Sequence, residues 1–342
     1  MRKDCAIFPG RQTGPCPFLT GARALCCLFL FVLVFSPPAF SAEEKDQTFK
    51  LAEHLVLGIK TQYMINSHTS YEFGEPEVPA LSPLSRLEFP LDSWWGGAEL
   101  RTVFPRFSAG VEALTNLSRE ASGDMEDSDW TDEDHPHVKT IYSTQKCRMK
   151  PSYNVKTDID LKVSDWLGLP EWLDLRPVAG FRWQYFNLVA HDGVQRDLSG
   201  ATPDIPLEGE SIAFDQTYWH YFAGLRAGLD LGNPVYLKSL VALLQCDWAY
   251  VEGHNADHHL MREGRRFTYE NTYGQAWHGS FGFKAGFTER LFLGFDADFM
   301  AISTKGSHRL VNEPFGIDEA WSTGVRVWSA QNSLSLKLQY VF

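Results

Sequence analysis

The sequence predicts an all-β fold: a transmembrane, antiparallel up-and-down β-barrel of about ten strands. Three observations support this prediction. Apolar and polar residues alternate with a period of two in many segments, as they do when one face of a strand contacts lipid and the other faces a barrel interior. Aromatic residues make up 14% of the chain, which fits the aromatic girdles of such barrels. No segment after residue 41 has the continuous apolar stretch of about 20 residues that a membrane helix needs.

The first 41 residues have the features of a cleaved export signal. Basic residues precede an apolar run at 24–35, Pro37 and Pro38 end it, and Ala39-Phe40-Ser41 provides a cleavage site. The run is too short to cross a bilayer, whose hydrocarbon core is about 30 Å thick. We therefore expect cleavage after Ser41 and one barrel domain over residues 42–342.

The charge of the chain limits its partners. Cleavage would remove a leader with a net charge of +3, so the net charge would change from −12 to −15. This balance disfavours nucleic acid as a partner and favours a cationic one. Four of the six cysteines belong to the leader, and Cys147 and Cys246 fall on separate predicted strands, so we expect no structural disulfide.

The C-terminal strand shows the alternation most clearly. Within residues 332–342 (NSLSLKLQYVF), one face carries Leu334, Leu336, Leu338, Tyr340 and Phe342, and the other carries Ser333, Ser335, Lys337 and Gln339. We assign the first face to lipid and the second to the barrel interior. A strand of a soluble β-sandwich is the simpler alternative. However, a terminal Phe after an alternating strand also resembles the assembly signal of outer-membrane barrels.

The same rhythm recurs along the chain and predicts the remaining strands. The ten predicted strands lie near residues 50–65, 84–101, 106–115, 149–163, 172–189, 216–231, 235–250, 267–287, 290–303 and 326–342. Their second face carries charges of both signs, for example Lys156, Asp158 and Arg182, which fits a polar, salt-bridged interior. In the strand at 84–101, Trp94-Trp95-Gly96-Gly97 interrupts the alternation, and we interpret this interruption as a bulge.

The connections alternate in length, which predicts the orientation. Short connections lie near Phe104-Pro105, Leu167–Pro170, Gly232-Asn233 and Thr288-Glu289. Long polar connections lie near 66–83, 116–148, 190–215, 251–266 and 304–325. Short turns are typical of the periplasmic side of an outer-membrane barrel, and long loops of the extracellular side. We therefore predict an outer-membrane location.

Two of the long connections contain residues that could act together. Residues 123–137 (GDMEDSDWTDEDHPH) hold seven carboxylates and no Lys or Arg, and residues 253–269 (GHNADHHLMREGRRFTY) hold Asp257, His258 and His259. These connections follow the third and seventh predicted strands, so they can face each other across the barrel mouth. An Asp-His pair opposite paired carboxylates could activate a water, because the imidazole takes its proton and the Asp orients the imidazole.

Simpler interpretations of both motifs stay open. The acidic segment could be a solvated surface, and Asp127-Ser128-Asp129 could ligate Ca²⁺. His254, His258 and His259 could bind a transition metal or be exposed loop residues. The sequence lacks the HExxH, GxSxG and P-loop motifs of familiar soluble hydrolases and NTPases.

The two motifs resemble those of the omptins, ten-stranded outer-membrane endoproteases with an Asp-Asp couple facing an Asp-His couple. Asp127-Ser128-Asp129-Trp130 matches the family's Asp-x-Asp-Trp, and Asp257-His258-His259 matches Asp-x-His before a basic-aromatic strand start at 265–269. The resemblance covers essentially the whole predicted mature chain. It implies an aspartate- and histidine-dependent endopeptidase that uses water directly, without a metal or another cofactor, at the extracellular mouth.

The resemblance also implies the roles of single residues. The catalytic residues would be Asp127, Asp129, Asp257 and His259. His258 is the alternative imidazole, because the adjacent pair leaves the register open by one. Omptins that cut between basic residues have an acid two positions before the catalytic Asp, where this chain has Asn255. Asn255, and Glu72 as the candidate for a second pocket acid, are the expected substrate-binding residues.

The expected partners are outer-membrane lipid and a peptide or protein substrate, with acidic walls favouring a cationic one. Where the family has a lipopolysaccharide-binding Tyr-x-Glu-x-Arg run, this chain has Phe181 to Tyr185 (FRWQY), so dependence on lipopolysaccharide stays open. The alternative function is a non-catalytic barrel, such as a narrow porin, an adhesin or a structural protein. A ten-stranded barrel with so many interior charges would be filled by its own side chains, which counts against a wide pore.

Overall fold

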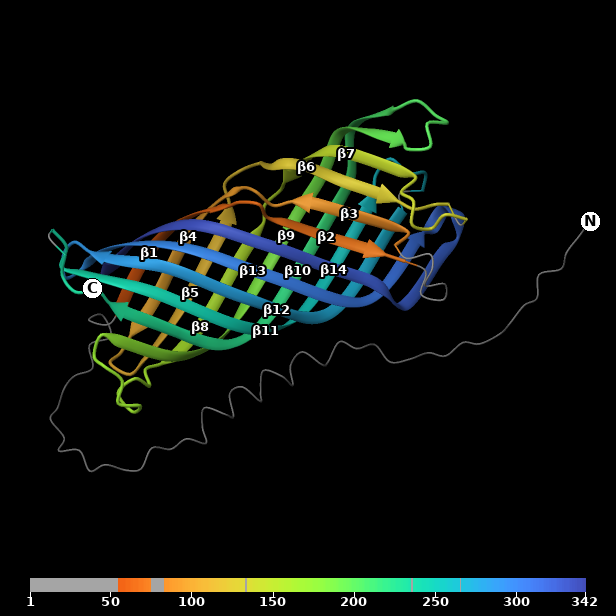
Figure 1. Ribbon diagram of the computed structural model, residues 1–342. Helices are drawn as coiled ribbons and strands as arrows, with labels where there is room; N and C mark the ends of the chain where they lie inside the picture. Colours follow the sequence, from red (N-terminus) through yellow and green to blue (C-terminus); the bar gives the residue numbers. More distant parts are fainter. Residues whose placement is uncertain (1–54, 75–82, 133, 235, 265) are drawn as a thin grey trace, which may run out of the picture. The chain divides into compact units, whose positions relative to one another are not determined.

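The computed structural model describes residues 55–74, 83–132, 134–234, 236–264 and 266–342. The predicted leader at 1–41 lies outside these ranges. Among the described residues, no helix is long and apolar enough to cross a membrane. Nearly all of this part of the chain is β-strand, which confirms the predicted all-β class (Figure 1).

Fourteen antiparallel strands of the described chain form one closed sheet. The strands are β1 (Leu55–Met64), β2 (His68–Phe73), β3 (Ser85–Pro90), β4 (Trp94–Val103), β5 (Phe107–Asn116), β6 (Glu120–Asp129), β7 (Ile141–Met149), β8 (Tyr153–Leu161), β9 (Leu173–Asp197), β10 (Ile205–Asp230), β11 (Ser239–His259), β12 (Arg266–Gly286), β13 (Leu291–Asn312) and β14 (Ile317–Val341). The sheet closes into a barrel because β14 pairs with β1.

The barrel consists of two stacked rings, and each ring contains ten strands, which is the number predicted. At one end the ring consists of β1, β4, β5, β8 and the six long strands β9 to β14. At the other end β2, β3, β6 and β7 take the places of the four short strands. Strand β14 pairs with β1 along 333–341 and with β2 along 325–330, so one long strand serves both rings.

Short interruptions separate the two rings, and one of them replaces the predicted bulge. The interruption lies at residues 91–93, before Trp94, and β4 then continues through both tryptophans and both glycines. The side chain of Asp92 accepts hydrogen bonds from the backbone N–H groups of Asn66 (3.0 Å) and Ser67 (2.6 Å). These bonds satisfy donors that the sheet leaves unpaired where β1 ends.

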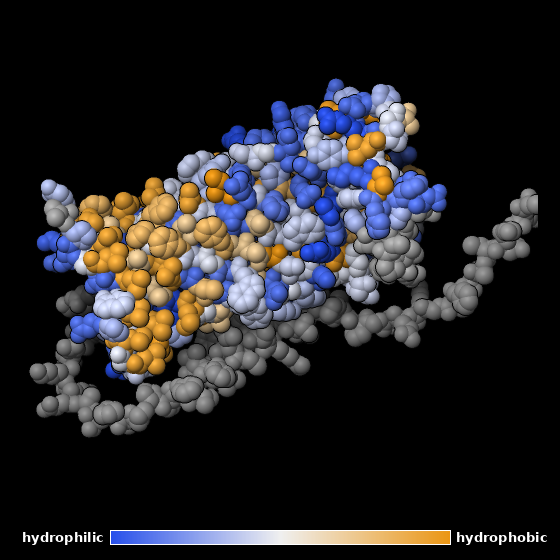
Figure 2. All heavy atoms as spheres, in the orientation of Figure 1, coloured by the Kyte–Doolittle hydropathy of each residue, from blue (hydrophilic) through white to orange (hydrophobic). Residues whose placement is uncertain are grey.

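The outer surface carries the apolar face that the alternation predicts. Leu334, Leu336, Leu338, Tyr340 and Phe342 are exposed, whereas Ser333, Ser335 and Gln339 are buried. Figure 2 shows hydrophobic residues gathered over the end of the barrel where the chain terminates, and hydrophilic residues over the other end. A large exposed apolar surface is unfavourable in water and fits a band in contact with lipid.

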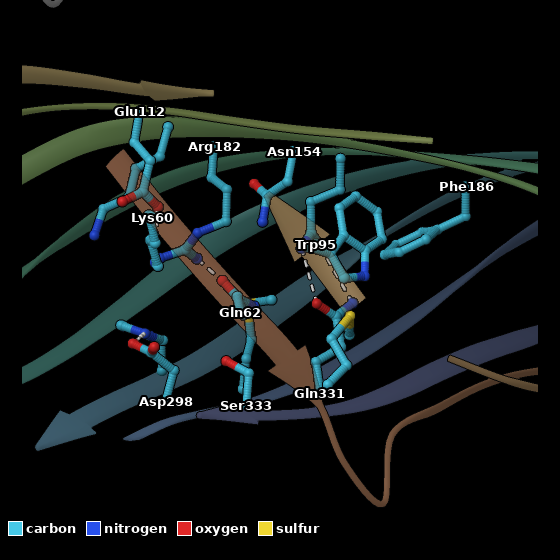
Figure 3. Close-up of a pocket in the computed structure, with 15 residues that line it drawn as sticks. Lys60, Gln62, Trp95, Glu112, Asn154, Arg182, Phe186, Asp298, Gln331 and Ser333 are labelled. Carbon is cyan, nitrogen blue, oxygen red and sulfur yellow. Dashed lines mark hydrogen bonds and ion pairs between the residues drawn. The ribbon is translucent and has the colours of Figure 1, made fainter. Parts of the chain in front are cut away.

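Charged and polar side chains fill the barrel interior at the level of this band. Figure 3 shows Lys60, Glu112 and Arg182 pointing into one cavity of about 70 Å³. The Lys60 Nζ donates to Glu112 at 3.0 Å, and the Gln184 amide donates to Gln331 at 2.8 Å. Pairing of this kind is what makes buried charge tolerable.

The interior at the other level is apolar and aromatic. Tyr71, Phe89 and Phe214 are almost fully buried, and the rings of Phe89 and Phe214 stack at 4.6 Å. Met125 and Leu87 are buried in the same core. This packed layer supports the residues above it, because close-packed side chains have little room to shift.

The hydrophilic end corrects one part of the prediction. Four segments expected as long loops, within 116–148, 190–215, 251–266 and 304–325, are largely strand: they contain β6, most of β7, and extensions of β9, β10, β11, β13 and β14. Both faces of these extensions can meet polar surroundings, so hydropathy need not alternate although the ladder hydrogen bonds continue. The predicted short turns do connect strands at the opposite end.

Candidate active site

Strand β6 directs two carboxylates toward the barrel mouth. Asp127 pairs with Leu87 of β3, and Asp129 pairs with Ser85. Cross-strand partners point to the same side of a sheet, and Leu87 is buried in the interior. Asp127 and Asp129 therefore both face inward, two residues apart on one strand, above Met125.

Strand β11 directs Asp257 and His259 to the same interior. The His259 Nε2 lies 3.0 Å from the Asp257 Oδ2, and the Asp257 side chain is fully buried. His258 lies between them and faces the other way, where its ring stacks on Phe267 at 3.9 Å. His259 is therefore the imidazole that shares a face with Asp257.

One residue of each couple, Asp129 and His259, lines a cavity at the hydrophilic end of the barrel. This cavity, called the cleft below, has a volume of about 360 Å³ and contains Asp129 and Trp130 on one side and His259, Arg262 and Arg266 on the other. Asp127 interacts electrostatically with Asp129, His259, Arg262 and Asp257. The four predicted catalytic residues are thus neighbours in space although about 130 positions separate the two pairs in the sequence.

The surroundings of Asp127 favour its protonated form. Burial, followed by the negative charge of Asp129, raises the pKa of Asp127 to about 7. Nearby His259 and Arg262 oppose this effect but do not cancel it. A carboxyl group with a pKa in this range can both donate and accept a proton near neutral pH.

The structure separates the two expected substrate-binding residues. Asn255 faces the interior two positions before Asp257; it is buried, and neither amide atom has a hydrogen-bond partner. Glu72 instead lies on the outer face of β2, because its neighbour Tyr71 is buried inside. Its carboxylate accepts two hydrogen bonds from Arg86, at 2.7 and 3.0 Å. Glu72 therefore does not reach the cleft, which corrects the expectation from its position in the chain.

Two groups in this region escaped the sequence reasoning. Arg266 lies directly opposite His259 in the β11–β12 pairing, and Glu270 lies opposite Asn255. Glu270 is buried and bonds His308 Nδ1 at 2.9 Å. Gly264 helps to set this register, since its φ of +79° lies in the left-handed region that glycine tolerates in a turn.

The register of this hairpin is the signal that could have found Arg266. In a tight hairpin centred near residue 262, residues at equal distances before and after the turn pair with each other, so His259 lies opposite Arg266.

Within the described ranges, no three His, Cys, Asp or Glu side chains are grouped so as to hold a metal ion. The two cysteines of the described chain are free, Cys147 buried and Cys246 exposed.

Comparisons with known proteins agree with this architecture. The Omptin family model matches residues 96–342. The structure is similar to that of the outer-membrane protease OmpT from Escherichia coli, with a TM-score of 0.71 and 14% identity over 86% of this chain and 99% of that one. The translocator domain of the autotransporter NalP from Neisseria meningitidis has a TM-score of only 0.36, with 8% identity over 94% of this chain and 95% of that one. Comparison with curated protein sequences gave no match.

Proposed function

The chain belongs to the omptin family, and on that premise we propose that it is an outer-membrane endopeptidase with an Asp-Asp couple and an Asp-His couple. The family and the barrel indicate an outer-membrane protein with a protease-like function. The finer statement is that a water held between the two couples attacks the peptide bond. The cleft would open on the extracellular side, since the long hairpins all lie at that end of the barrel.

One observation supports the proposal: Asp129 and His259, one residue of each couple, line a single cleft, and Asp127 interacts electrostatically with Asp129, His259 and Asp257. Buried Asp257 would hold a proton on the His259 Nε2, which leaves the Nδ1 lone pair to accept a proton from water. The resulting hydroxide attacks the carbonyl carbon and forms a tetrahedral intermediate. The imidazolium then returns the proton to the leaving nitrogen, and the C–N bond breaks.

Asp127 and Asp129 would position the water on the opposite side. With a pKa raised to about 7, Asp127 can be present as the neutral acid at neutral pH, so it can donate a hydrogen bond to the developing oxyanion. Asp129 then accepts a hydrogen bond from the attacking water. No covalent enzyme intermediate is needed in this sequence of steps.

The alternative of a diffusion pore receives less support. Lys60, Glu112 and Arg182 occupy the interior at the level of the apolar band, and the cavities there measure about 70 and 340 Å³. Charged side chains that cross the lumen and pair with one another obstruct a wide channel.

The test is cleavage of quenched-fluorescent peptide libraries by the refolded barrel, with and without lipopolysaccharide. Asp127→Ala and His259→Ala should each lower kcat/KM by about 10³-fold or more. His258→Ala is the matched control, because this imidazole is adjacent in sequence but lies on the outer face, and it should change kcat/KM by less than about threefold. If correctly folded wild type cleaves nothing under either condition, the non-catalytic barrel becomes the better explanation.

A further inference from the structure

The cleft contains a guanidinium group without an anionic partner. Arg266 is half-buried, and its Nε is buried without a hydrogen-bond partner. Among the described residues, no carboxylate forms an ion pair with it. Arg309, on the neighbouring strand β13, shows the usual arrangement, since it holds both oxygens of Asp318 at 2.8 Å. A partly buried charge without a partner is costly, so a site that keeps one has room for a ligand of opposite charge.

A second, smaller cavity adjoins Arg266, and we call it the slot. Its volume is about 50 Å³, and its walls include Phe73, Leu84, Leu310 and Trp321, with Arg266 and His308 as its basic side chains. The ring of His308 stacks between those of Phe73, at 4.8 Å, and Trp321, at 5.6 Å. No carboxylate lines this cavity. The slot is therefore apolar along its walls and positive at Arg266.

The slot adjoins the cleft. Phe73, Leu84 and Arg266 line both cavities. Arg266 is also the direct cross-strand neighbour of His259, and such neighbours have Cβ atoms about 5 Å apart. A substrate side chain next to the bond that His259 acts on is thus within reach of the slot.

We propose, resting on the proposed protease function, that the slot binds an acidic side chain of the substrate, and glutamate best, at a position next to the cleaved bond. The carboxylate forms charge-assisted hydrogen bonds with the Arg266 guanidinium. The aliphatic stem of glutamate packs against Phe73 and Leu310, where glutamine would leave the charge of Arg266 unmatched.

The surrounding charges exclude the opposite preference in the slot. A lysine or arginine side chain would meet Arg266 and no acid. Glu270 lies behind His308 and is engaged with it at 2.9 Å, and Asn255 takes the place of an acid two positions before Asp257. The net negative charge of the chain can still attract cationic peptides from a distance, because long-range attraction and the fit of one side chain are separate effects.

The experiment compares kcat/KM for matched peptides that carry Glu, Gln or Lys at each position flanking the cleaved bond. At one position the wild type should prefer Glu over Gln by about tenfold and over Lys by more. Arg266→Gln should reduce the Glu/Gln ratio to about one, because kcat/KM falls more for the Glu peptide than for the Gln peptide, and Arg266→Glu should reverse the order to Lys over Glu. Arg309→Gln, on the opposite face of β13, is the control and should keep the wild-type ratio.

Two results would overturn the inference: wild type that cleaves the Gln and Lys peptides as well as the Glu peptide at every position, or an unchanged Glu/Gln ratio in a folded Arg266→Gln barrel. If folded wild type cleaves no peptide, the proposed protease function fails separately. The slot is then tested by fluorescence anisotropy, with fluorescein-labelled Glu and Gln peptides binding to wild type and Arg266→Gln. Tighter binding of the Glu peptide to wild type alone supports the slot, and equal affinities refute it.

Discussion

The lipid-level interior and the cleft treat buried charge in opposite ways. In the interior, the Asp160 carboxylate interacts with three guanidinium groups, those of Arg101, Arg176 and Arg226. In the cleft, Arg266 has no carboxylate partner among the described residues, and one oxygen of Asp127 is buried without a hydrogen bond. The shared pairing in the interior stabilises the folded chain, whereas the cleft keeps a guanidinium whose carboxylate partner a substrate can supply.

The same contrast separates two Asp-His pairs. Asp257 and His259 form the pair in the cleft, at 3.0 Å. Asp247 and His278 form a pair in the interior, at 2.7 Å, and His278 also faces Asp298. Similar chemistry thus occurs at two depths: His259 lines the cleft together with Asp129, whereas His278 lines the interior cavity among paired charges such as Lys60 and Glu112.

The largest effect should come from Asp257→Asn. An amide cannot stabilise an imidazolium or hold the same tautomer, so we expect a loss of about 10³- to 10⁴-fold in kcat. Asp247→Asn is the matched substitution in the interior; it should lower the denaturant midpoint and leave kcat of the folded fraction within threefold. Equal losses of kcat in both variants would contradict the division between the two regions.

Removing Asp160 should give the largest loss of stability. Asp160→Ala removes the carboxylate that three arginines share. Arg101 and Arg226 keep Asp158, and Arg176 keeps Asp174, so the free energy of unfolding should fall by about 1–3 kcal/mol, the cost of leaving buried donors unsatisfied. Urea unfolding in detergent micelles, followed by tryptophan fluorescence, measures this change. A loss below about 1 kcal/mol would mean that water, and not the network, solvates these arginines.

A stabilising substitution is expected in the cleft. The pKa of Asp127 is raised in the folded chain to about 7, so its contribution to stability is fully present below pH 4 and is lost as the pH rises through about 7. Asp127→Asn removes this loss and should make the barrel more stable than wild type by about 1–2 kcal/mol at pH 8, but not at pH 4. Unfolding curves at the two pH values test this, and equal differences at both would refute it.

The smallest effect should come from Glu72→Gln. This carboxylate lies on the outer wall with Arg86 and away from the cleft, so substrate preference should not change and the free energy of unfolding should fall by less than about 1 kcal/mol. Peptide profiling and urea unfolding of the same preparation measure both. A change in preference for basic residues would return Glu72 to the substrate site.

The sequence predicted the membrane-level half of the barrel well, and the reason is physical. Lipid and a polar lumen impose opposite hydropathy on alternate residues, so Leu334 to Phe342 revealed both the strand and its faces. Residues 120–129 and 253–259 are strands beyond the apolar band, where that constraint ends, so their hydropathy pattern predicts loops.

The candidate site was predictable where it depended on short motifs and not where it depended on side-chain direction. Asp127, Asp129, Asp257 and His259 could be named, but their role in catalysis stays a prediction. The period of two decides which of His258 and His259 faces Asp257, and it also places Glu72 outside. To identify Arg266, one must know that positions 259 and 266 pair across a hairpin, and no short sequence motif carries this information.

The interruptions between the two rings have a consequence for engineering. Each ring closes through its own strand pairs, and the Asp92 bonds to Asn66 and Ser67 lie at the seam. The barrel can therefore be divided into the ring that contains β1, β4, β5 and β8, at the level of the lipid, and the ring that contains β2, β3, β6 and β7, around the cleft. Grafting β2, β3, β6 and β7 from a relative, with the seam residues kept, would exchange the wall of the cleft that contains Phe73 and Asp129, while Arg266 on β12 and the membrane-level part stay as they are.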